Sequence, residues 1–201
     1  PGEWIPNIYG GNENLDAIEF LKHLNSIYRH MSEGAFIIAD DNSGYPVLTG
    51  EVNEECIGFE YKWNYEWKND VLGYMNTVPY RRSENYNDIS NTLIYHYTDN
   101  FINGFAHNEF VNGKASLIGR MTGDNDESKF ANLRLMYGFM YMHPGKKMLF
   151  MGQEFAQYEP WDINGELDWS LLKEDKHMQV QEYVKALNEL YTNETALYEL
   201  D

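Results

Sequence analysis

The stretch Gly34-Ala35-Phe36-Ile37-Ile38-Ala39-Asp40-Asp41-Asn42 decides the fold class. It is apolar without alternation as far as Ala39 and becomes polar abruptly at Asp40. An unbroken apolar run of this length, following a helix, is typical of a parallel strand that is covered on both faces. We therefore predict a strand over residues 35–39, with a candidate site at its polar end. An Asp-rich turn without a function is the alternative interpretation of that end.

The segment that precedes this strand has the pattern of a helix over residues 12–30. Asn12 is the expected N-cap, and acidic residues follow it in the first turn, where the helix dipole favours negative charge. Apolar residues recur at helical spacing, and we expect this stripe to face the core. Its members are Leu15, Ile18, Leu21, Leu24, Ile27 and Tyr28.

The rest of the chain alternates between strand-like and helix-like patterns. The predicted strands cover residues 57–61, 100–106 and 148–151, and the predicted helices cover residues 89–98, 128–142 and 176–195. Another helix is expected to end near Met75, because Pro79 follows closely. We expect residues 123–127 to form a solvated acidic loop. The core face expected for the last helix is Met178, Tyr183, Leu187, Leu190 and Tyr191.

This alternation predicts an α/β fold, either a (β/α) barrel or a doubly wound parallel sheet. About four strands are expected, whereas a complete (β/α)₈ barrel has eight strands and typically about 250 residues. The 201 residues therefore correspond to about half a barrel. Because the chain begins at Pro1 without a methionine, we expect residues 1–201 to be one partial barrel domain of a longer protein.

Composition excludes several classes of function. The net charge of −17 repels polyanions, so nucleic-acid binding is not expected. No apolar run approaches the roughly 20 residues that span a bilayer, so no membrane partner is expected either. The single cysteine, Cys56, cannot form an internal disulfide and fits a reducing compartment, and we expect a cytoplasmic protein.

Polar clusters follow the ends of three predicted strands: Asp40-Asp41, His107-Asn108-Glu109 and Gln153-Glu154. The carboxyl ends of the strands are where an α/β fold of this kind carries its site. Cleavage of glycosidic bonds with retention uses two carboxyl groups about 5–5.5 Å apart, one as nucleophile and one as proton donor. The 16 Tyr, 10 Phe and 5 Trp add rings that suit stacking on sugars, although we expect most of them to be core.

No other chemistry is better supported by the sequence. It contains no Gly-rich nucleotide-binding motif, no CxxC and no HExxH, so neither a cofactor nor a metal ion is expected. A hydrolase triad of Asp41, Ser43 and His107 would lack the sequence of a nucleophile elbow around Ser43. The alternative interpretation of residues 107–109 is an ordinary polar turn with one hydrogen-bonded histidine.

Seven runs spread over nearly the whole chain carry a family resemblance. They are GEWIPN (2–7), ENLDAIEFL (13–21), GFEYKWN (58–64), AHNE (106–109), KFANLR (129–134), PGKKMLFMG (144–152) and ELDW (166–169). In this order they resemble the 1,4-α-glucan branching enzymes of the α-amylase superfamily, glycoside hydrolase family 13. The resemblance implies a retaining enzyme that cleaves an α-1,4-glucan and transfers the segment to a 6-hydroxyl, which forms an α-1,6 branch in glycogen. It also implies the C-terminal half of the barrel, about strands five to eight.

The resemblance assigns catalytic positions, and this chain departs from the family at two of them. The position of the acid/base glutamate holds Asp40, and the position of the transition-state-stabilising aspartate holds Asn108. The nucleophile would precede Pro1, so this chain contains no nucleophile. Asp40 has one methylene less than glutamate, and a displacement of about 1 Å can cost about 10²-fold in rate. Asn108 removes a negative charge that would stabilise an oxocarbenium-like transition state. We therefore expect the chain alone to be inactive.

The resemblance also implies which residues bind the glucan and which partners the chain has. The implied substrate-binding residues are His107, Glu109, Tyr61, Lys62 and Trp63. The implied partners are an α-glucan and either the missing N-terminal half of the barrel or another copy of the chain, because half a barrel leaves strand edges open.

Two other functions remain open. One is a catalytically silent α-glucan-binding protein, in which Tyr61, Trp63 and Trp161 stack on glucose rings. The other is a hydrolase of the α-amylase family. The Tyr-Lys-Trp-Asn run at residues 61–64 favours a branching enzyme over this hydrolase.

Overall fold

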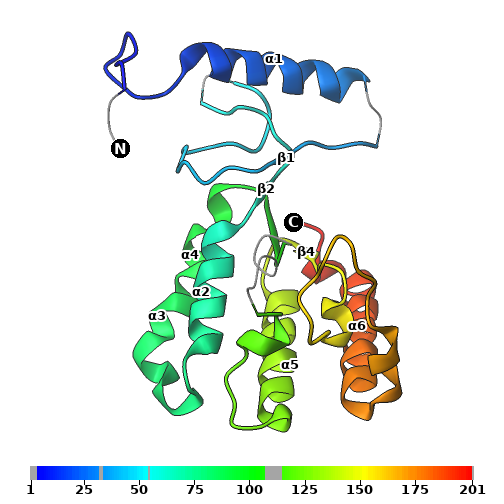
Figure 1. Ribbon diagram of the computed structural model, residues 1–201. Helices are drawn as coiled ribbons and strands as arrows, with labels where there is room; N and C mark the ends of the chain where they lie inside the picture. Colours follow the sequence, from blue (N-terminus) through cyan, green and yellow to red (C-terminus); the bar gives the residue numbers. More distant parts are fainter. Residues whose placement is uncertain (1–3, 32–33, 54, 107–114, 201) are drawn as a thin grey trace. The chain divides into compact units, whose positions relative to one another are not determined.

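The computed structural model describes residues 4–31, 34–53, 55–106 and 115–200. These residues form two compact units, which we describe one at a time. The first unit comprises residues 1–63 with 98–100, and the second comprises residues 64–97 with 101–201. In Figure 1 the first unit is drawn mainly in blue and cyan, and the second runs from turquoise to red.

The first unit begins with helix α1, Leu15–Met31, which confirms the predicted helix at 12–30 to within a few residues. The predicted N-cap Asn12 is wrong. The Oδ1 atom of Asn14 accepts a hydrogen bond from the backbone N–H of Ala17 at 3.0 Å, so Asn14 caps the helix. The structure therefore starts α1 nearly one turn later than the acidic pattern indicated.

The apolar stripe of α1 is only partly core. Ile18 and Leu21 pack against a small buried cluster of Ala39, Leu48 and Ile57. Leu24 and Ile27 are 43% and 57% exposed, so the expectation that the whole stripe faces the core is wrong. No segment of the described part of the first unit covers the second half of the stripe, which explains the exposure. The buried residue of α1 is instead Asn25, whose side chain donates to the carbonyl of Ile57 at 3.1 Å.

Two short parallel strands complete the first unit. They are β1, Ile38–Ala39, and β2, Tyr61–Trp63, with Ile38 opposite Tyr61 and Ala39 opposite Lys62. Strand β1 is the end of the predicted strand at 35–39. The prediction that both faces of this strand are covered is wrong, because Phe36 is 57% exposed.

Strand β2 lies further along the chain than the predicted strand at 57–61. Gly58 has a φ of +97°, in the left-handed region that a strand does not use. The backbone N–H groups of Gly58 and Phe59 both donate to the carbonyl of Leu48, at 3.1 and 3.0 Å. This bent segment delays regular pairing until Tyr61.

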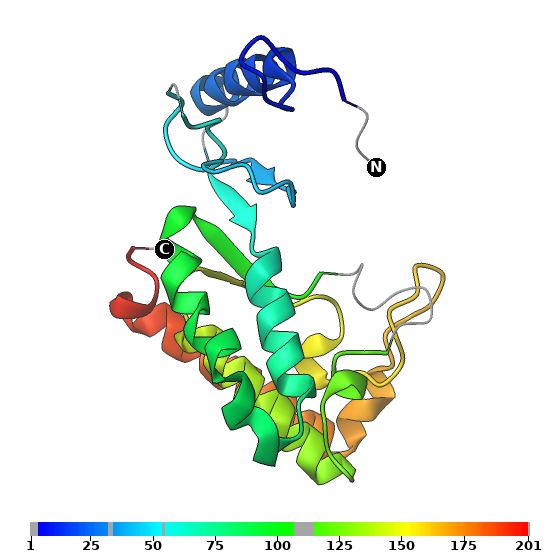
Figure 2. The same ribbon diagram turned by 90° about the vertical axis from the view of Figure 1, so that its left-hand side faces the viewer.

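The second unit contains the longer helices. They are α2 (Tyr65–Asn76), α3 (Tyr86–Ser90), α4 (Thr92–Tyr95), α5 (Asp126–Met142) and α6 (Asp175–Asn193). Short 3-10 helices connect them: η1 (Pro79–Asn85), η2 (His96–Thr98), η4 (Ile118–Arg120), η5 (Gln153–Phe155), η6 (Trp169–Lys173) and η7 (Thr195–Leu197). Figure 2 shows α2 beside the α3–α4 segment, which takes the place of the single helix predicted at 89–98. The ends expected near Met75 and for helix 176–195 are confirmed to within two residues.

Helix α5 begins two residues before the predicted start at 128. Asn125 caps it, because its Oδ1 atom accepts the backbone N–H of Ser128 at 2.9 Å. Asp126 and Glu127 therefore lie in the first helical turn, and the expectation of an acidic loop over 123–127 is wrong for these two residues. Their charges face the positive end of the helix dipole, which stabilises them there. The helix ends at Met142, directly before His143-Pro144-Gly145, as predicted.

The second unit contains the parallel strands β3 (Phe101–Gly104) and β4 (Lys146–Met148), with Ile102 opposite Lys146. Strand β3 falls within the predicted strand at 100–106. Strand β4 begins two residues earlier than the predicted strand at 148–151 and ends at Met148. Gly104 lies opposite Met148, and a Cβ atom at Gly104 would come within 2.7 Å of the Met148 carbonyl oxygen. The close approach of β3 to β4 therefore requires glycine at this position.

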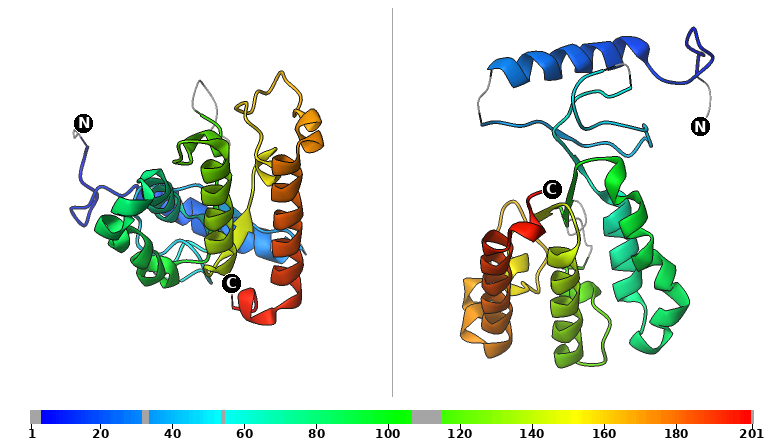
Figure 3. Two further views of the ribbon diagram at one scale, coloured as in Figure 1. Left: turned by 90° about the horizontal axis from the view of Figure 1, so that it is seen from below. Right: turned by 180° about the vertical axis from the view of Figure 1, so that it is seen from behind.

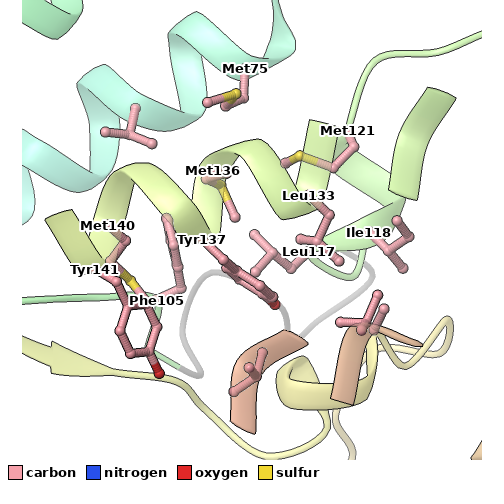
Figure 4. Close-up of a cluster of buried hydrophobic side chains, with 14 of the residues drawn as sticks. Met75, Phe105, Leu117, Ile118, Met121, Leu133, Met136, Tyr137, Met140 and Tyr141 are labelled. Atoms are coloured by element: carbon pink, nitrogen blue, oxygen red, sulfur yellow. The ribbon is translucent and has the colours of Figure 1, made fainter. Parts of the chain in front are cut away.

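Helix α5 forms the middle of the main hydrophobic core, with α2 and α6 both packed against it (Figure 3). Figure 4 shows its side chains Leu133, Met136, Tyr137 and Met140, all without solvent exposure, together with Phe105, which follows β3. The Tyr137 hydroxyl donates to the carbonyl of Gln153 at 2.7 Å, which joins the helix to η5.

The buried face of α6 matches the predicted one only in part: Leu187 is buried, and Tyr183 and Tyr191 pack against the core as expected. Its buried residues are His177, Val180, Val184 and Leu187. Met178 and Leu190, which were expected in the core, are 44% and 40% exposed. The Nδ1 atom of His177 lies 2.9 Å from the carbonyl oxygen of Phe155, and its ring packs edge-on against Phe130 and Tyr158. This hydrogen bond allows a polar ring to occupy a core position.

A buried polar network joins α2, β3 and the end of α5. Asn64 caps α2 and also donates to the Oδ1 atom of Asn103 at 2.9 Å. Asn103 in turn lies 3.2 Å from Nδ1 of His143, and Nε2 of His143 lies 3.0 Å from the Thr92 hydroxyl. Burial lowers the pKa of His143 to about 4, so the ring is neutral at pH 7.

Among the described residues, no helix combines the length and apolarity needed to cross a bilayer.

Candidate functional site

The first unit contains a cleft of about 590 Å³ between the start of α1 and the segment that follows β1. Its volume lies in the usual range for ligand pockets. The rim carries polar side chains: Asn12, Glu13, Asn14, Asp40, Asp41 and Ser43. The floor is apolar and includes Ile18, Leu21, Ala39, Leu48, Ile57 and Phe59.

Asp40 and Asp41 come to this cleft because they directly follow β1, whose last residue is Ala39. Asp40 is exposed, and Asp41 is partly buried. The Oδ2 atom of Asp41 accepts the backbone N–H of Ser43 at 3.2 Å, which fixes the turn after the strand. The structure thus places the predicted acid/base position at the mouth of a cleft, with a second carboxylate beside it.

Lys62 lies between two carboxylates. Its Nζ atom is 3.9 Å from Oδ2 of Asp41 and 3.9 Å from Oδ2 of Asp99. Asp99 is almost completely buried, with a side chain that is 3% exposed. A cation next to two anions offsets part of their mutual repulsion. Lys62 therefore lies between Asp41, which lines the cleft, and the buried Asp99.

Asp99 is anchored by the segment at residues 48–49. Its Oδ1 atom accepts the backbone N–H groups of Leu48 and Thr49 and the hydroxyl of Thr49, each at 2.9 Å. The Thr49 hydroxyl also accepts the backbone N–H of Asn100 at 2.7 Å. Sequence reasoning missed Asp99, because these partners lie about 50 positions away along the chain. The only sequence signal is a carboxylate just before an apolar strand.

Tyr61 and Trp63 do not line the cleft. They alternate with Lys62 along β2, so they project to the opposite face of the strand. The Tyr61 ring contacts Phe36 edge-on, with ring centroids 5.5 Å apart. The implied binding residues of β2 are thus divided between two faces, and Lys62 alone reaches the acidic end of β1.

The remaining predicted site residues lie elsewhere. His107, Asn108 and Glu109 fall outside the described residues. Trp161, expected to stack on glucose, belongs to the second unit, where its ring meets Phe150 edge-on at 5.3 Å. Gln153, from the third polar strand end, has a structural role: its amide donates to the carbonyl of Phe105 and its Oε1 atom accepts the N–H of Phe150.

The cleft lining carries acidic side chains, and its described residues offer no metal-binding geometry. In the described ranges, no three His, Cys, Asp or Glu side chains are arranged to hold a metal ion. Glu13, Asp40 and Asp41 bring three carboxylates to the rim, and no basic side chain is found among the described residues that line it. Such a rim accepts hydrogen bonds from hydroxyl groups and repels anions.

Comparison with known proteins gives a consistent answer over the whole chain. No family model matches it. A 1,4-alpha-glucan branching enzyme GlgB from Pseudomonas putida is 47% identical over 200 residues, which is 100% of this chain and 27% of that enzyme. The enzyme from Clostridium perfringens is 46% identical over 201 residues, 100% of this chain and 30% of the enzyme. The enzyme from Francisella tularensis subsp. mediasiatica is 44% identical over 201 residues, with 100% and 31% covered.

The chain is a partial homologue of the 1,4-alpha-glucan branching enzymes. It spans about a quarter to a third of the length of the curated relatives it matches, 27% to 31%. The resemblance stated from the sequence runs is thereby confirmed. An α/β chain with four short parallel strands, covering this share of a branching enzyme, is consistent with part of a barrel.

Proposed function

We propose that the chain is a segment of the catalytic barrel of a 1,4-α-glucan branching enzyme, corresponding to about strands five to eight. The observation that carries the proposal is identity of 44% to 47% with branching enzymes over the whole chain. The proposed substrate is an α-glucan, which the full enzyme would cleave at an α-1,4 bond and rejoin at a 6-hydroxyl. The single cysteine, Cys56, supports a cytoplasmic location.

Asp40 takes the proposed position of the proton donor. Its place after β1, exposed at the mouth of the cleft, supports this role, because a donor must reach the glycosidic oxygen. Its side chain is one methylene shorter than that of glutamate, so the proton would start further from that oxygen. We infer that the protonation step is slowed by this retraction.

Asn108 takes the proposed position of the stabilising aspartate, and His107 and Glu109 are proposed to bind the glucan beside it. An amide accepts hydrogen bonds but carries no charge. The positive charge that develops on the sugar ring would therefore lose an electrostatic partner. With the nucleophile also outside this chain, we propose that the 201 residues do not turn over alone.

The test of this function is a product analysis. Amylose incubated with the chain should show no new α-1,6 linkages by proton nuclear magnetic resonance. Addition of a polypeptide that carries the preceding half of a branching-enzyme barrel should allow the chain to associate with it. New α-1,6 linkages made by the chain alone would contradict the proposed inactivity.

A catalytically silent α-glucan-binding protein is the second candidate, and the cleft supports it. A volume of about 590 Å³ with a polar rim and an apolar floor suits a sugar without any need for turnover. This candidate would be favoured if the chain binds maltoheptaose and if a barrel completed with the preceding half still forms no branches. A hydrolase of the same superfamily is less supported, because the relatives described above are branching enzymes.

A further inference from the structure

We propose that Asn164 is a site of spontaneous deamidation in the folded chain, through a ring that its side chain forms with the backbone nitrogen of Gly165. The chain contains three Asn-Gly pairs, at residues 103–104, 112–113 and 164–165. The structure describes the first and the third of them, and it places these two in opposite surroundings. The inference concerns a chemical modification, so it holds whether or not the proposed function is correct.

The reaction takes only water as a co-reactant. The backbone nitrogen of the glycine gives up its proton and attacks Cγ of the asparagine side chain, the Cγ–Nδ2 bond breaks, and ammonia leaves with that proton. Water then opens the resulting cyclic imide at either carbonyl, which yields aspartate or isoaspartate. Glycine favours the attack, because it has no Cβ atom to hinder the approach and its backbone rotates freely.

Asn164 meets the conditions for this reaction. Together with Gly165 it lies in an exposed turn. Its backbone N–H donates to Oδ1 of Asp162 at 2.9 Å, and the Gly165 N–H donates to the Asp162 carbonyl at 3.1 Å. Such a turn at the surface opens at little cost in free energy. The Nδ2 atom of Asn164 lies 3.5 Å from Oδ1 of Asp162, at the limit of a hydrogen bond, and a rotation of the exposed side chain breaks this contact.

The two ends of the loop that carries this turn are fastened away from its tip. The Oε1 atom of Gln157 accepts the backbone N–H of Asp168 at 3.0 Å, and its Nε2 atom donates to the carbonyl of Glu159 at 3.0 Å. Gln157 is itself buried. The turn at Asn164 can therefore change its covalent structure while the ends of the loop stay in place.

Asn103 provides an internal comparison, because the fold protects it. Its side chain has no solvent exposure, its Oδ1 atom accepts from Asn64 at 2.9 Å, and its Nδ2 atom donates to the carbonyl of Pro144 at 2.6 Å. The backbones of Asn103 and Gly104 are paired with β4. Attack on Cγ requires the side chain to leave these partners and the strand to open, so the folded chain suppresses the reaction here.

Peptide mapping by mass spectrometry tests the proposal on the whole chain, incubated in mildly alkaline buffer either folded or in urea. The rate in urea measures the reactivity of each Asn-Gly pair without the fold. Folding should leave the rate at Asn164 within about threefold of its value in urea and should lower the rate at Asn103 at least about tenfold. The peptide with residues 112–113 is quantified separately, so that its products are not counted at Asn164.

Gly165→Ala is the most direct variant, because it keeps Asn164 and the turn. The atom nearest to the new Cβ would be Cβ of Asp162, 3.5 Å away, which is an ordinary van der Waals contact. The methyl group hinders the approach of the backbone nitrogen, so deamidation at Asn164 should slow at least about tenfold. Gly73→Ala is the matched control: it adds a Cβ atom in open space in α2 and should leave the rate unchanged.

Three results would overturn the proposal. The first is suppression at Asn164 by folding to the same degree as at Asn103. The second is an equal rate at both sites in the folded chain, because the fold would then not select the site. The third is an unchanged rate at Asn164 in Gly165→Ala.

Discussion

The ammonium group of Lys62 lies 3.9 Å from the carboxylate of Asp99, a side chain that is only 3% exposed. Burial of an unpaired carboxylate is costly, so a buried anion requires hydrogen bonds and a nearby cation. Asp99 has both, since three donors from Leu48 and Thr49 reach its other oxygen. The pair joins three separate segments of the first unit and places the charge of Lys62 next to Asp41.

We expect Asp99→Asn to destabilise the first unit. The amide oxygen still accepts hydrogen bonds, but the side chain no longer carries the charge that faces Lys62. Its NH₂ group is also a hydrogen-bond donor where the carboxylate oxygen was an acceptor. The free energy of unfolding should fall by about 1–3 kcal/mol. Urea unfolding followed by tryptophan fluorescence measures the change. Asp124→Asn, at an exposed residue, should stay within about 0.5 kcal/mol of the original chain.

Gly104→Ala should destabilise the second unit. The new Cβ atom would meet the carbonyl oxygen of Met148 at 2.7 Å, and this backbone atom cannot move without separating β3 from β4. We expect a loss of about 1–3 kcal/mol, as for other overpacked sites. Gly73→Ala is the control, because nothing lies within 4 Å of its Cβ position in α2. This second change should stabilise the chain by about 0.5–1 kcal/mol. Equal effects of the two changes would contradict the packing of β3 on β4.

His143 should make the second unit sensitive to mild acid. Its pKa in the folded chain is about 4, against an ordinary value of 6.5, mainly because burial disfavours the charged ring. Above pH 6.5 the ring is neutral in both the folded and the unfolded chain, so its burial causes no pH-dependent loss of stability. As the pH falls from 6.5 towards 4, the unfolded chain gains a proton that the folded chain does not, so stability is lost over that window. The loss amounts to about 3 kcal/mol at most.

Unfolding at a series of pH values measures this loss. His143→Gln should flatten the decline between pH 6.5 and 4, whereas His23→Gln, at an exposed histidine of α1, should not. Identical pH profiles for the original chain and His143→Gln would show that this ring does not control the acid response.

The exposed apolar face of α1 predicts self-association or loose packing. Phe20, Leu24, Ile27 and Met31 recur at intervals of three and four residues and are 43% to 79% exposed. Apolar patches of this kind mark contacts with another surface. We expect sedimentation velocity to show species heavier than the 23.6 kDa chain, or a broad distribution. Phe20→Ser with Ile27→Ser should shift the distribution towards the monomer. A compact monomer with cooperative unfolding would argue against an incomplete barrel.

Long helices were the part of the fold that the sequence could predict best. Helices α5 and α6 lie within two residues of their predicted bounds, since apolar periodicity and a His-Pro-Gly stop are local signals. The buried face of α6 was harder to predict. His177 is a polar residue, and its burial depends on contacts with Phe155, Phe130 and Tyr158 that only the folded chain creates.

Strand bounds and the site depended on contacts that are distant in sequence. Strand β2 begins where pairing with β1 becomes regular, and the bend at Gly58 that delays it is set by Leu48. The place of Asp40 directly after β1 could be predicted, because it ends an apolar run; its catalytic role stays a prediction. The anchoring of Asp99 could not, since its partners are brought to it only in the folded chain.

The most direct test of the central claim uses a complete branching enzyme as the host. The Pseudomonas putida enzyme, 47% identical over 200 residues, can have its matching segment replaced by this chain. Branching of amylose is then measured for this chimera and for the same chimera with Asp40→Glu and Asn108→Asp. We predict at least a 10²-fold lower rate for the unaltered segment and recovery of branching with both substitutions. Equal activity of the two chimeras, or a folded chimera that stays inactive after both substitutions, would contradict the assignment of Asp40 and Asn108 as the altered catalytic positions of a branching-enzyme barrel.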